Sequence, residues 1–199
     1  MTSDAEAIRS TYTGKRFLDF VLALGAILVF SVPMLVVAFL VRLTSQGPAL
    51  YWSERVGAGG QNFRMPKFRT MRVGTPAVAT HLMKDPGTYL TPIGSVLRRS
   101  SLDELPQLIS VLMGHMSVVG PRPALFNQHD LMALRVSAGV ATLKPGLTGW
   151  AQIQGRDELS LQRKVEFERE YALKISLWTD LKIILLTVPK ILGQDGVSH

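Results

Sequence analysis

The sequence contains no cysteine, which excludes disulfides, zinc–thiolate sites and thiol nucleophiles. Histidine is also scarce, and no two histidines have the spacing of metal ligands; they are His81, His115, His129 and His199. No internal repeat or low-complexity tract is present. Cysteine chemistry is therefore excluded as the basis of function, and no histidine-based metal centre is indicated.

Acidic residues are outnumbered, with 15 Asp and Glu against 22 Lys and Arg, which gives a formal net charge of +7. This surplus indicates an anionic partner, for which nucleic acid, anionic lipid and phosphorylated small molecules all remain open. Apolar residues make up 47% of the chain and the mean hydropathy is +0.20. A chain of 199 residues can build one domain with a core, and this composition points toward a membrane.

The segment Phe20–Val41 carries no charge and would form a helix about 33 Å long, enough to cross a bilayer. It lacks the cleavage site of a signal peptide, so the simplest interpretation is a transmembrane helix. Pro33 interrupts the hydrogen bonding to Val29, and the Ser31 hydroxyl could bond to freed backbone groups. A sharp bend at Ser31–Pro33 is therefore physically reasonable.

Basic residues flank both ends of the apolar segment, and a spanning helix would export one basic flank, against the positive-inside tendency. These residues are Lys15 and Arg16 before it, and Arg42, Arg55, Arg64, Lys67, Arg69 and Arg72 after it. A helix that enters, bends and returns would keep both flanks in the cytoplasm. The expected organisation is a flexible N-terminus over 1–14, a re-entrant membrane helix over 15–43 and a cytosolic or interfacial catalytic domain over 44–199.

Residues Ala49–Val56 and Asn62–Arg69 predict two strands around the turn GAGGQ, followed by a surface loop over Gly74–Thr91. Basic residues in the second strand are typical of a solvated edge hairpin, and would equally suit a phosphate site. The segment VVGPRP, Val118–Pro123, fixes the backbone around Arg122, which suits phosphate recognition or a rigid turn. The glycine-rich segment Leu143–Arg156 is expected to be an irregular loop, without the setting of a P-loop.

The stretch SSLDELPQL precedes a helix that Gly114 would end. Its apolar residues recur at helical spacing: Leu105, Leu108, Ile109, Leu112 and Met116. Pro106 is tolerated only in a first turn, so Asp103 is the expected N-cap, with a capping box of Ser101 and Glu104 as the competing assignment. By itself, an acidic pair in a first turn is typical of capping, because the helix dipole favours it.

Two helices complete the chain, a charged one over Glu158–Lys174 and an amphipathic one over Leu177–Leu192. The second is too short and too interrupted by Pro189 to span a membrane, and suits either an interfacial helix or a core helix. The sequence therefore predicts an α+β, mainly helical fold: a monotopic membrane protein with a re-entrant helix-break-helix, a small β-hairpin and amphipathic interfacial helices.

Taken in order, six segments resemble the motifs of the bacterial sugar transferases, and the short length resembles their small monotopic polyprenyl-phosphate phosphoglycosyl transferases. The segments are KRFLDF, KFRTM, SLDELPQL, MSVVGPRP, KPGLTGWAQIQGR and DLKI, spread over Lys15 to Leu192. The resemblance implies transfer of a sugar-1-phosphate from a UDP-sugar to undecaprenyl phosphate, with release of UMP. It further implies Mg²⁺ as cofactor, membrane lipid and downstream glycosyltransferases as partners, no nucleic acid, and the cytoplasmic face of the bacterial inner membrane.

The resemblance also implies roles for individual residues. Asp103 and Glu104 would be the catalytic pair, with the first carboxylate forming a covalent phosphosugar intermediate. Asp103 and Glu168 would hold the metal, although the family usually has aspartate at the second position. Contacts to substrate phosphate or nucleotide are expected from Arg98, Arg122, Lys67, Arg69 and Arg156. Lys15 and Asp180 would join the membrane helix to the C-terminal helix, and the helix would break at Ser31 and Pro33, here separated by Val32.

Two other functions are compatible with parts of the sequence. A non-enzymatic binder of anionic lipid or nucleic acid would explain the charge and the apolar content, but not an acidic pair beside fixed arginines. A bitopic protein with an exported domain, such as a lipid pyrophosphate phosphatase, would use the apolar segment as a span. Within the phosphoglycosyl transferase interpretation, direct displacement by the lipid phosphate is the alternative to a covalent intermediate.

Overall fold

The computed structural model describes residues 11–76, 83, 85–155 and 159–192, so most of the expected flexible N-terminus lies outside the described residues. The helices are α2 (Lys15–Thr44), α3 (Gly94–Arg99), α4 (Gln107–Met113), α5 (His129–Ser137), α6 (Trp150–Gln154), α7 (Leu161–Leu173) and α8 (Leu177–Leu192). Three short 3₁₀ turns are η1 (Ala58–Gly60), η3 (Pro86–Tyr89) and η4 (Leu102–Glu104). The strands are β1 (Leu50–Val56), β2 (Asn62–Phe68), β3 (Ser117–Val119), β4 (Ala124–Leu125) and β5 (Gly146–Thr148).

The predicted hairpin is confirmed to within a residue at its outer ends, and it forms most of a three-stranded antiparallel sheet in the order β2-β1-β4. Tyr51 lies opposite Lys67 in the register of the hairpin. On its other side β1 pairs with β4, which places Arg55 opposite Leu125. The second sheet consists of β3 and β5 in parallel. The α+β, mainly helical prediction is confirmed.

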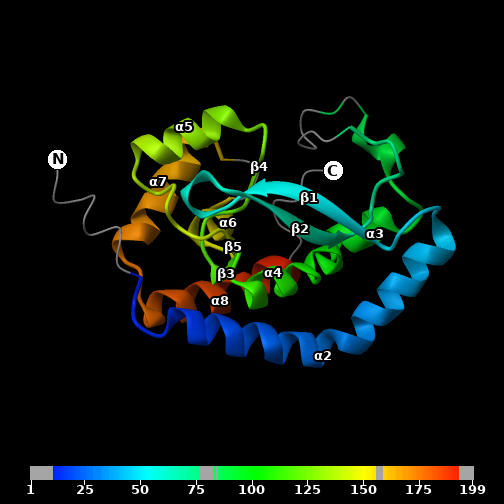
Figure 1. Cartoon of the computed structure of the whole chain (residues 1–199), viewed down its shortest axis with the longest axis horizontal. Coiled ribbons are helices and arrows are strands. Elements are labelled where there is room, and N and C mark those ends of the chain that lie inside the picture. Colours follow the sequence, from blue (N-terminus) through cyan, green and yellow to red (C-terminus); the bar gives the residue numbers. More distant parts are fainter. Residues whose placement is uncertain (1–10, 77–82, 84, 156–158, 193–199) are drawn as a thin grey trace.

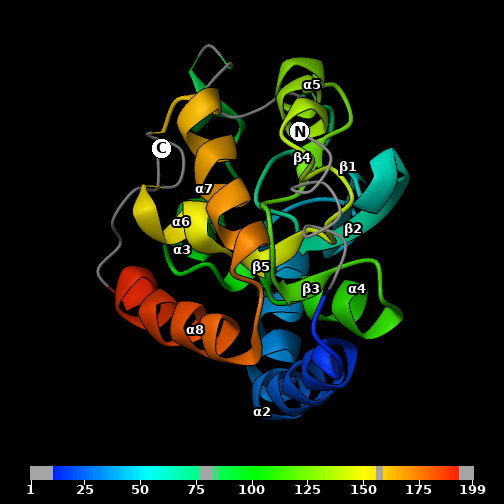
Figure 2. The same cartoon turned by 90° about the vertical axis from the view of Figure 1, so that its left-hand side faces the viewer.

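The long helix α2 lies along one side of the molecule together with α4 and α8, as Figures 1 and 2 show, while the hairpin, α5 and α7 lie on the other side. Its best 18-residue window has a mean hydropathy of 2.7 and is 11% buried. By length and composition, α2 could cross a membrane. Its outward surface is apolar, with Phe17, Leu28, Val29 and Leu35 among the most exposed side chains.

The predicted break in α2 is a bend rather than an interruption. The helix continues through Pro33, and Figure 1 shows that its two halves run in different directions. The Ser31 hydroxyl donates a hydrogen bond of 2.9 Å to the carbonyl oxygen of Leu28. Because proline has no N–H and crowds the preceding turn, it bends a helix without ending it when neighbouring groups satisfy the backbone.

The N-terminal end of α2 is attached to the rest of the fold by buried polar contacts. The Lys15 ammonium lies 2.5 Å from the Asp180 carboxylate of α8, so the predicted contact between these helices is confirmed. Asp180 also accepts hydrogen bonds from the hydroxyls of Tyr12 and Tyr171. Asp19 accepts hydrogen bonds from the Ser117 hydroxyl and from the backbone N–H that follows it. One face of the start of α2 is therefore joined to α8, α7 and β3.

The C-terminal end of α2 is attached to the same body through Arg69, which follows β2 directly. The Arg69 guanidinium donates to the hydroxyl and the carbonyl of Ser45, and to the carbonyl of Gly47. Arg69 is 5% exposed, and Gly47 has a φ of +99° with no room for a side chain beside the guanidinium. Both ends of α2 are thus hydrogen-bonded to one folded body.

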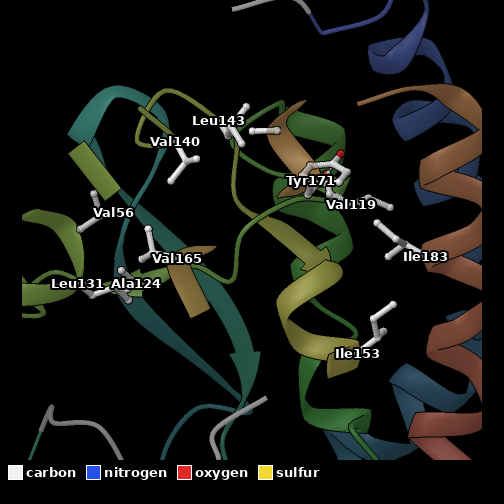
Figure 3. Close-up of a cluster of buried hydrophobic side chains, with 11 residues drawn as sticks. Val56, Val119, Ala124, Leu131, Val140, Leu143, Ile153, Val165, Tyr171 and Ile183 are labelled. Carbon is white, nitrogen blue, oxygen red and sulfur yellow. Dashed lines mark hydrogen bonds between the residues drawn. The ribbon is translucent and has the colours of Figure 1, made fainter. Parts of the chain in front are cut away.

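The largest buried cluster joins the hairpin, α5 and α7 to α8, and Figure 3 shows its side chains. Val56, Leu131 and Val165 meet at one end, and Tyr171 and Ile183 at the other. Helix α8 takes part with one face only: Ile183 is buried, whereas Trp178 and Leu185 are 77% and 71% exposed. Helix α8 therefore packs one face into the core, as a core helix does, and leaves its other apolar face exposed, as an interfacial helix would.

The glycine-rich segment after Leu143 is more regular than expected, because it contains β5 and α6. Its glycines serve close backbone packing. A Cβ at Gly146 would lie 2.1 Å from the nitrogen of Gly120, and one at Gly149 would lie 2.1 Å from the oxygen of Gly120. These glycines therefore allow β3 and β5 to approach each other, which corrects the expectation of an irregular loop.

Candidate active site

The acidic pair lies in the 3₁₀ turn η4, between α3 and α4. Ser101 before it has a left-handed conformation with φ of 56°, which reverses the chain after α3. Asp103 is not an N-cap, so that prediction was wrong. Ser101 occupies the N-cap position of η4, as the competing assignment had it, but makes no side-chain cap hydrogen bond there. Gly114 ends α4 with a φ of 85° as predicted. The Asp103 side chain is turned inward and is 7% exposed. A carboxylate this buried and without a capping role needs another explanation.

Three predicted substrate-binding residues surround the pair, and each comes from a different element. Lys67 of β2 places its ammonium 2.9 Å from Glu104 Oε1. Arg122, between the two prolines that follow β3, places its guanidinium 3.4 Å from the same oxygen. Arg98 of α3 donates to the Thr70 hydroxyl at 3.0 Å. Glu104 therefore takes part in two ion pairs, while Asp103 lies beside it deeper in the fold.

Burial raises the pKa of the Asp103 carboxyl to about 6. Lys67, Arg98 and Arg122 act against this increase because positive charge stabilises the carboxylate, whereas the neighbouring Glu104 adds to it. Asp103 is therefore ionised at neutral pH but incompletely solvated. An ionised, poorly solvated carboxylate is a stronger nucleophile than one in water, and the cations around it would attract an anionic substrate.

Arg55 belongs to this site, although the sequence indicated it only as part of a basic flank. Its guanidinium donates to the Ser53 hydroxyl at 2.9 Å and to the carbonyl oxygen of Pro123 at 3.0 Å. Burial, and then the positive charge of Arg122, lower its pKa to about 10. The pairing of β1 with β4 brings Arg55 here, and no local pattern in the sequence indicates that pairing.

A hollow opens beside the acidic pair. Its polar lining comes from the side chains of Arg55, Lys67, Glu104, Gln107 and Arg122, and the rest from Met65, Pro123, Gly146 and Leu147. The hollow lies at the junction of β1, β2, η4, α4 and the segment that precedes β4. Cations, a carboxylate and apolar walls thus converge in one place, as in sites that bind phosphorylated ligands.

Two other predicted site residues, Arg69 and Glu168, are held by contacts away from the acidic pair. Arg69 is held at the end of α2, so we assign it a structural role. Both carboxylate oxygens of Glu168 accept hydrogen bonds from the buried Arg135 guanidinium, at 2.5 and 2.8 Å. This ion pair argues against the expectation that Glu168 binds a metal. Arg156 lies outside the described residues.

The described residues contain no group of three or more Asp, Glu, His or Cys side chains that could hold a metal ion. Mg²⁺ commonly binds through one or two carboxylates together with substrate phosphates and water. Asp103 and Glu104 are adjacent in the chain and fit such a shared site. The donor set therefore fits a magnesium ion that arrives with a diphosphate, and not one held by protein ligands alone.

Comparison with known proteins points to a single family. The model of the family described as bacterial sugar transferase matches residues 10–194. A protein of Xanthomonas campestris pv. campestris, named UDP-glucose:undecaprenyl-phosphate glucose-1-phosphate transferase, is 40% identical over 188 residues, which are 90% of this chain and 39% of that protein. The chain therefore spans about two fifths of this relative.

Two further relatives differ in length and in the sugar that their names give. The exopolysaccharide production protein ExoY of Rhizobium meliloti (strain 1021) is 38% identical over 199 residues, which cover 92% of this chain and 87% of the relative. A UDP-N-acetylgalactosamine-undecaprenyl-phosphate N-acetylgalactosaminephosphotransferase of Aeromonas hydrophila is 35% identical, over 92% of this chain and 44% of the relative.

Proposed function

The chain belongs to the bacterial sugar transferase family, and on that basis we propose that it is a phosphoglycosyl transferase. In the proposed reaction a sugar-1-phosphate moves from a UDP-sugar to undecaprenyl phosphate, with release of UMP, as the first membrane step in making a glycoconjugate or polysaccharide. The observation that carries this proposal is the buried carboxylate of Asp103 inside a group of cations, next to a second carboxylate.

In the first step an Asp103 oxygen attacks the β-phosphorus of the UDP-sugar. A bond forms between that oxygen and phosphorus, the bond from phosphorus to the bridging oxygen breaks, and UMP leaves with the bridging oxygen and its electron pair. Phosphoryl transfer of this kind depends mainly on positioning and on neutralising the charge of the phosphate oxygens. Lys67, Arg98 and Arg122 surround the pair from three elements and suit that task.

In the second step a phosphate oxygen of undecaprenyl phosphate attacks the phosphorus of the aspartyl phosphosugar. The new bond forms to the lipid phosphate, the bond to the Asp103 oxygen breaks, and the carboxylate is regenerated. A carboxylate is a good leaving group because it is a weak base. Glu104 lies at the more exposed side of the pair, where it can help to orient the incoming phosphate together with a metal ion.

Asp103 and Glu104 would hold Mg²⁺ together with the diphosphate, and the ion when bound would neutralise charge on the phosphate oxygens. The described cations divide into two groups by their contacts. Lys67 and Arg122 contact Glu104 directly, whereas Arg98 is anchored on Thr70. We therefore expect the first two to move from Glu104 to the diphosphate when substrate and metal are present.

We also propose that α2 enters the bilayer of the bacterial inner membrane from the cytoplasmic face and returns to that face. A spanning helix has its ends on opposite sides of a bilayer, but Lys15 at one end and Ser45 after the other contact the same folded body. The bend at Pro33 and the exposed apolar surface of α2 support this topology. The exposed Trp178 and Leu185 of α8 support an interfacial position for that helix.

Release of UMP tests the proposed function. Purified protein with Mg²⁺ and undecaprenyl phosphate is assayed against a panel that includes UDP-glucose and UDP-N-acetylgalactosamine, the two sugars given in the relatives' names. We expect release with at least one sugar, loss of release in Asp103→Asn, and normal release in the control Asp130→Asn, an exposed acid on α5. Undiminished release by Asp103→Asn would contradict the assignment and favour another nucleophile or direct displacement.

A further inference from the structure

Gln107 has an unusual position for a polar side chain. It is 3% exposed, and its amide nitrogen Nε2 has no hydrogen-bond partner. Leaving a buried polar group without a partner destabilises the fold, so such groups in native proteins call for an explanation. Gln107 lines the hollow beside the acidic pair, at the start of α4. Nε2 itself is out of solvent contact, so a ligand in the hollow could supply the missing acceptor once the side chain turns toward it.

The charges around the hollow indicate what kind of ligand this is. Arg55, Lys67 and Arg122 line it, and Glu104 is the one acid among its lining residues. Arg55 and Arg122 are close enough for each to oppose the other's charge. A group of like charges with an unsatisfied donor among them is stabilised by an anion, and phosphate oxygens accept hydrogen bonds from both amides and guanidinium groups.

The hollow lies beside Glu104 and is not lined by the proposed nucleophile, which favours one of the two phosphates of a UDP-sugar. Glu104 lines the hollow, whereas Asp103 is not among its lining residues. In-line attack by Asp103 places the leaving oxygen on the far side of the β-phosphorus. The phosphate attached to that oxygen is the one that leaves with the nucleoside, so it must lie beyond the reacting phosphorus.

We propose that the hollow is the subsite for the phosphate that leaves as UMP, and that Arg55 and the Gln107 amide bind its oxygens. The proposal rests on the proposed function, because it takes Asp103 as the nucleophile. Neither residue was indicated by sequence as a ligand contact. Arg55 is pre-organised, since its contacts with Ser53 and Pro123 fix the guanidinium before a ligand binds.

Binding of UMP to the purified protein tests the subsite without turnover. Gln107→Met keeps the size of the side chain and removes the amide, and Gln107→Glu keeps the shape and adds a negative charge. We expect about tenfold weaker UMP binding for Gln107→Met, because a hydrogen bond to a charged group is lost, and a larger loss for Gln107→Glu. Arg55→Met should weaken binding similarly. The matched controls are Gln162→Met on α7 and Arg64→Met on β2, both exposed, and they should bind UMP normally.

Kinetics then separate a phosphate contact from a sugar contact. In Gln107→Met, KM should increase by the same factor for every UDP-sugar that the wild type uses. Two results would overturn the subsite while leaving the proposed function intact. One is an increase in KM that differs between sugars, and the other is unchanged UMP affinity in both Gln107 variants. Absence of UMP release by the wild type with all sugars would overturn the proposed function, and UMP binding by the variants would still decide the subsite. If Arg55→Met fails to fold, the two Gln107 variants decide.

Discussion

At the scale of single residues, Asp103 combines burial with charge at a free-energy cost to the folded protein. Its pKa is raised from 3.8 to about 6, mainly by burial. The folded state therefore binds the Asp103 proton more tightly than the unfolded state does. Above pH 6 the ionised carboxylate reduces the free energy of unfolding, by about 3 kcal/mol for a shift of about two pKa units.

Asp103→Asn should consequently unfold less readily than the wild type at alkaline pH, even though we expect it to lack activity. We expect a gain of up to about 3 kcal/mol at pH 8, and roughly half of that at pH 5, because the wild-type carboxyl is then mostly protonated when folded. Unfolding of both proteins is measured in detergent with EDTA and without substrate, so that no metal contributes. A variant that is less stable than wild type at pH 8 would show that the carboxylate has a structural role.

If Asp103 is the nucleophile, the same pKa should set the decrease of activity on the acid side. The protonated carboxyl is not a nucleophile, so kcat/KM for the UDP-sugar should decrease as the pH falls through about 6. The quantity kcat/KM is appropriate because it reports groups of the free enzyme. A rate profile over pH 4.5 to 8.5 measures it, with Asp130→Asn as control. A midpoint near the ordinary aspartate value would contradict the desolvated environment of Asp103.

The grouping of site residues was predictable where a motif fixed both the residue type and its neighbours. Asp103, Glu104 and Arg122 lie in short motifs, and the structure places them together. Arg69 was expected to contact substrate phosphate with Lys67. It follows the strand that carries Lys67, but its side chain turns toward the end of α2. Arg55 was missed because its position depends on a pairing between β1 and β4, which are far apart in sequence.

At the scale of elements, segments with strong periodicity were predicted and short packed segments were not. The hairpin and α8 have the expected bounds to within a residue, since their patterns extend over seven or more residues. Strand β5 and helix α6 contain three and five residues and are rich in small residues. Their existence depends on the close approach of β5 to β3, which no local pattern encodes.

Helices α5 and α7 are joined by the buried ion pair of Arg135 and Glu168, and Arg135 also donates to the carbonyl of Arg122 at 2.9 Å. Glu168→Gln should lower the free energy of unfolding by about 3 kcal/mol, because it leaves a buried guanidinium without its counter-charge. Chemical denaturation in detergent measures this, and the exposed Glu166→Gln is the control.

The magnesium dependence of Glu168→Gln separates a structural role from a metal-binding role. Because Arg135 occupies both oxygens of Glu168, we expect the concentration of Mg²⁺ for half-maximal activity to stay unchanged in the folded variant. A large increase in that concentration, with normal stability, would restore Glu168 as a metal ligand and contradict the structural interpretation.

At the scale of the whole molecule, the attachment of both ends of α2 to one body relates the fold to the membrane. The acidic pair, the hollow and both ends of the helix belong to one folded body, so a re-entrant α2 would keep the candidate active site at the surface where a lipid phosphate lies. The sequence predicted the bend from Ser31 and Pro33, but the helix remains continuous through it.

Because the chain has no cysteine, single cysteines can report its topology. Thr13→Cys and Gln46→Cys flank α2. With a membrane-impermeant maleimide we expect neither variant to react in intact cells and both to react after lysis. Reaction of only one of them in intact cells would show that α2 spans the membrane.

The central claim is that an Asp103 oxygen becomes bonded to phosphorus. The most direct measurement is mass spectrometry of the protein after brief incubation with Mg²⁺ and an accepted UDP-sugar in the absence of undecaprenyl phosphate. We expect a mass increase equal to one phosphosugar, mapped to the peptide that carries Asp103, absent in Asp103→Asn and discharged when undecaprenyl phosphate is added. A phosphosugar on another residue, or UMP release in the complete reaction without any adduct under trapping conditions, would contradict it.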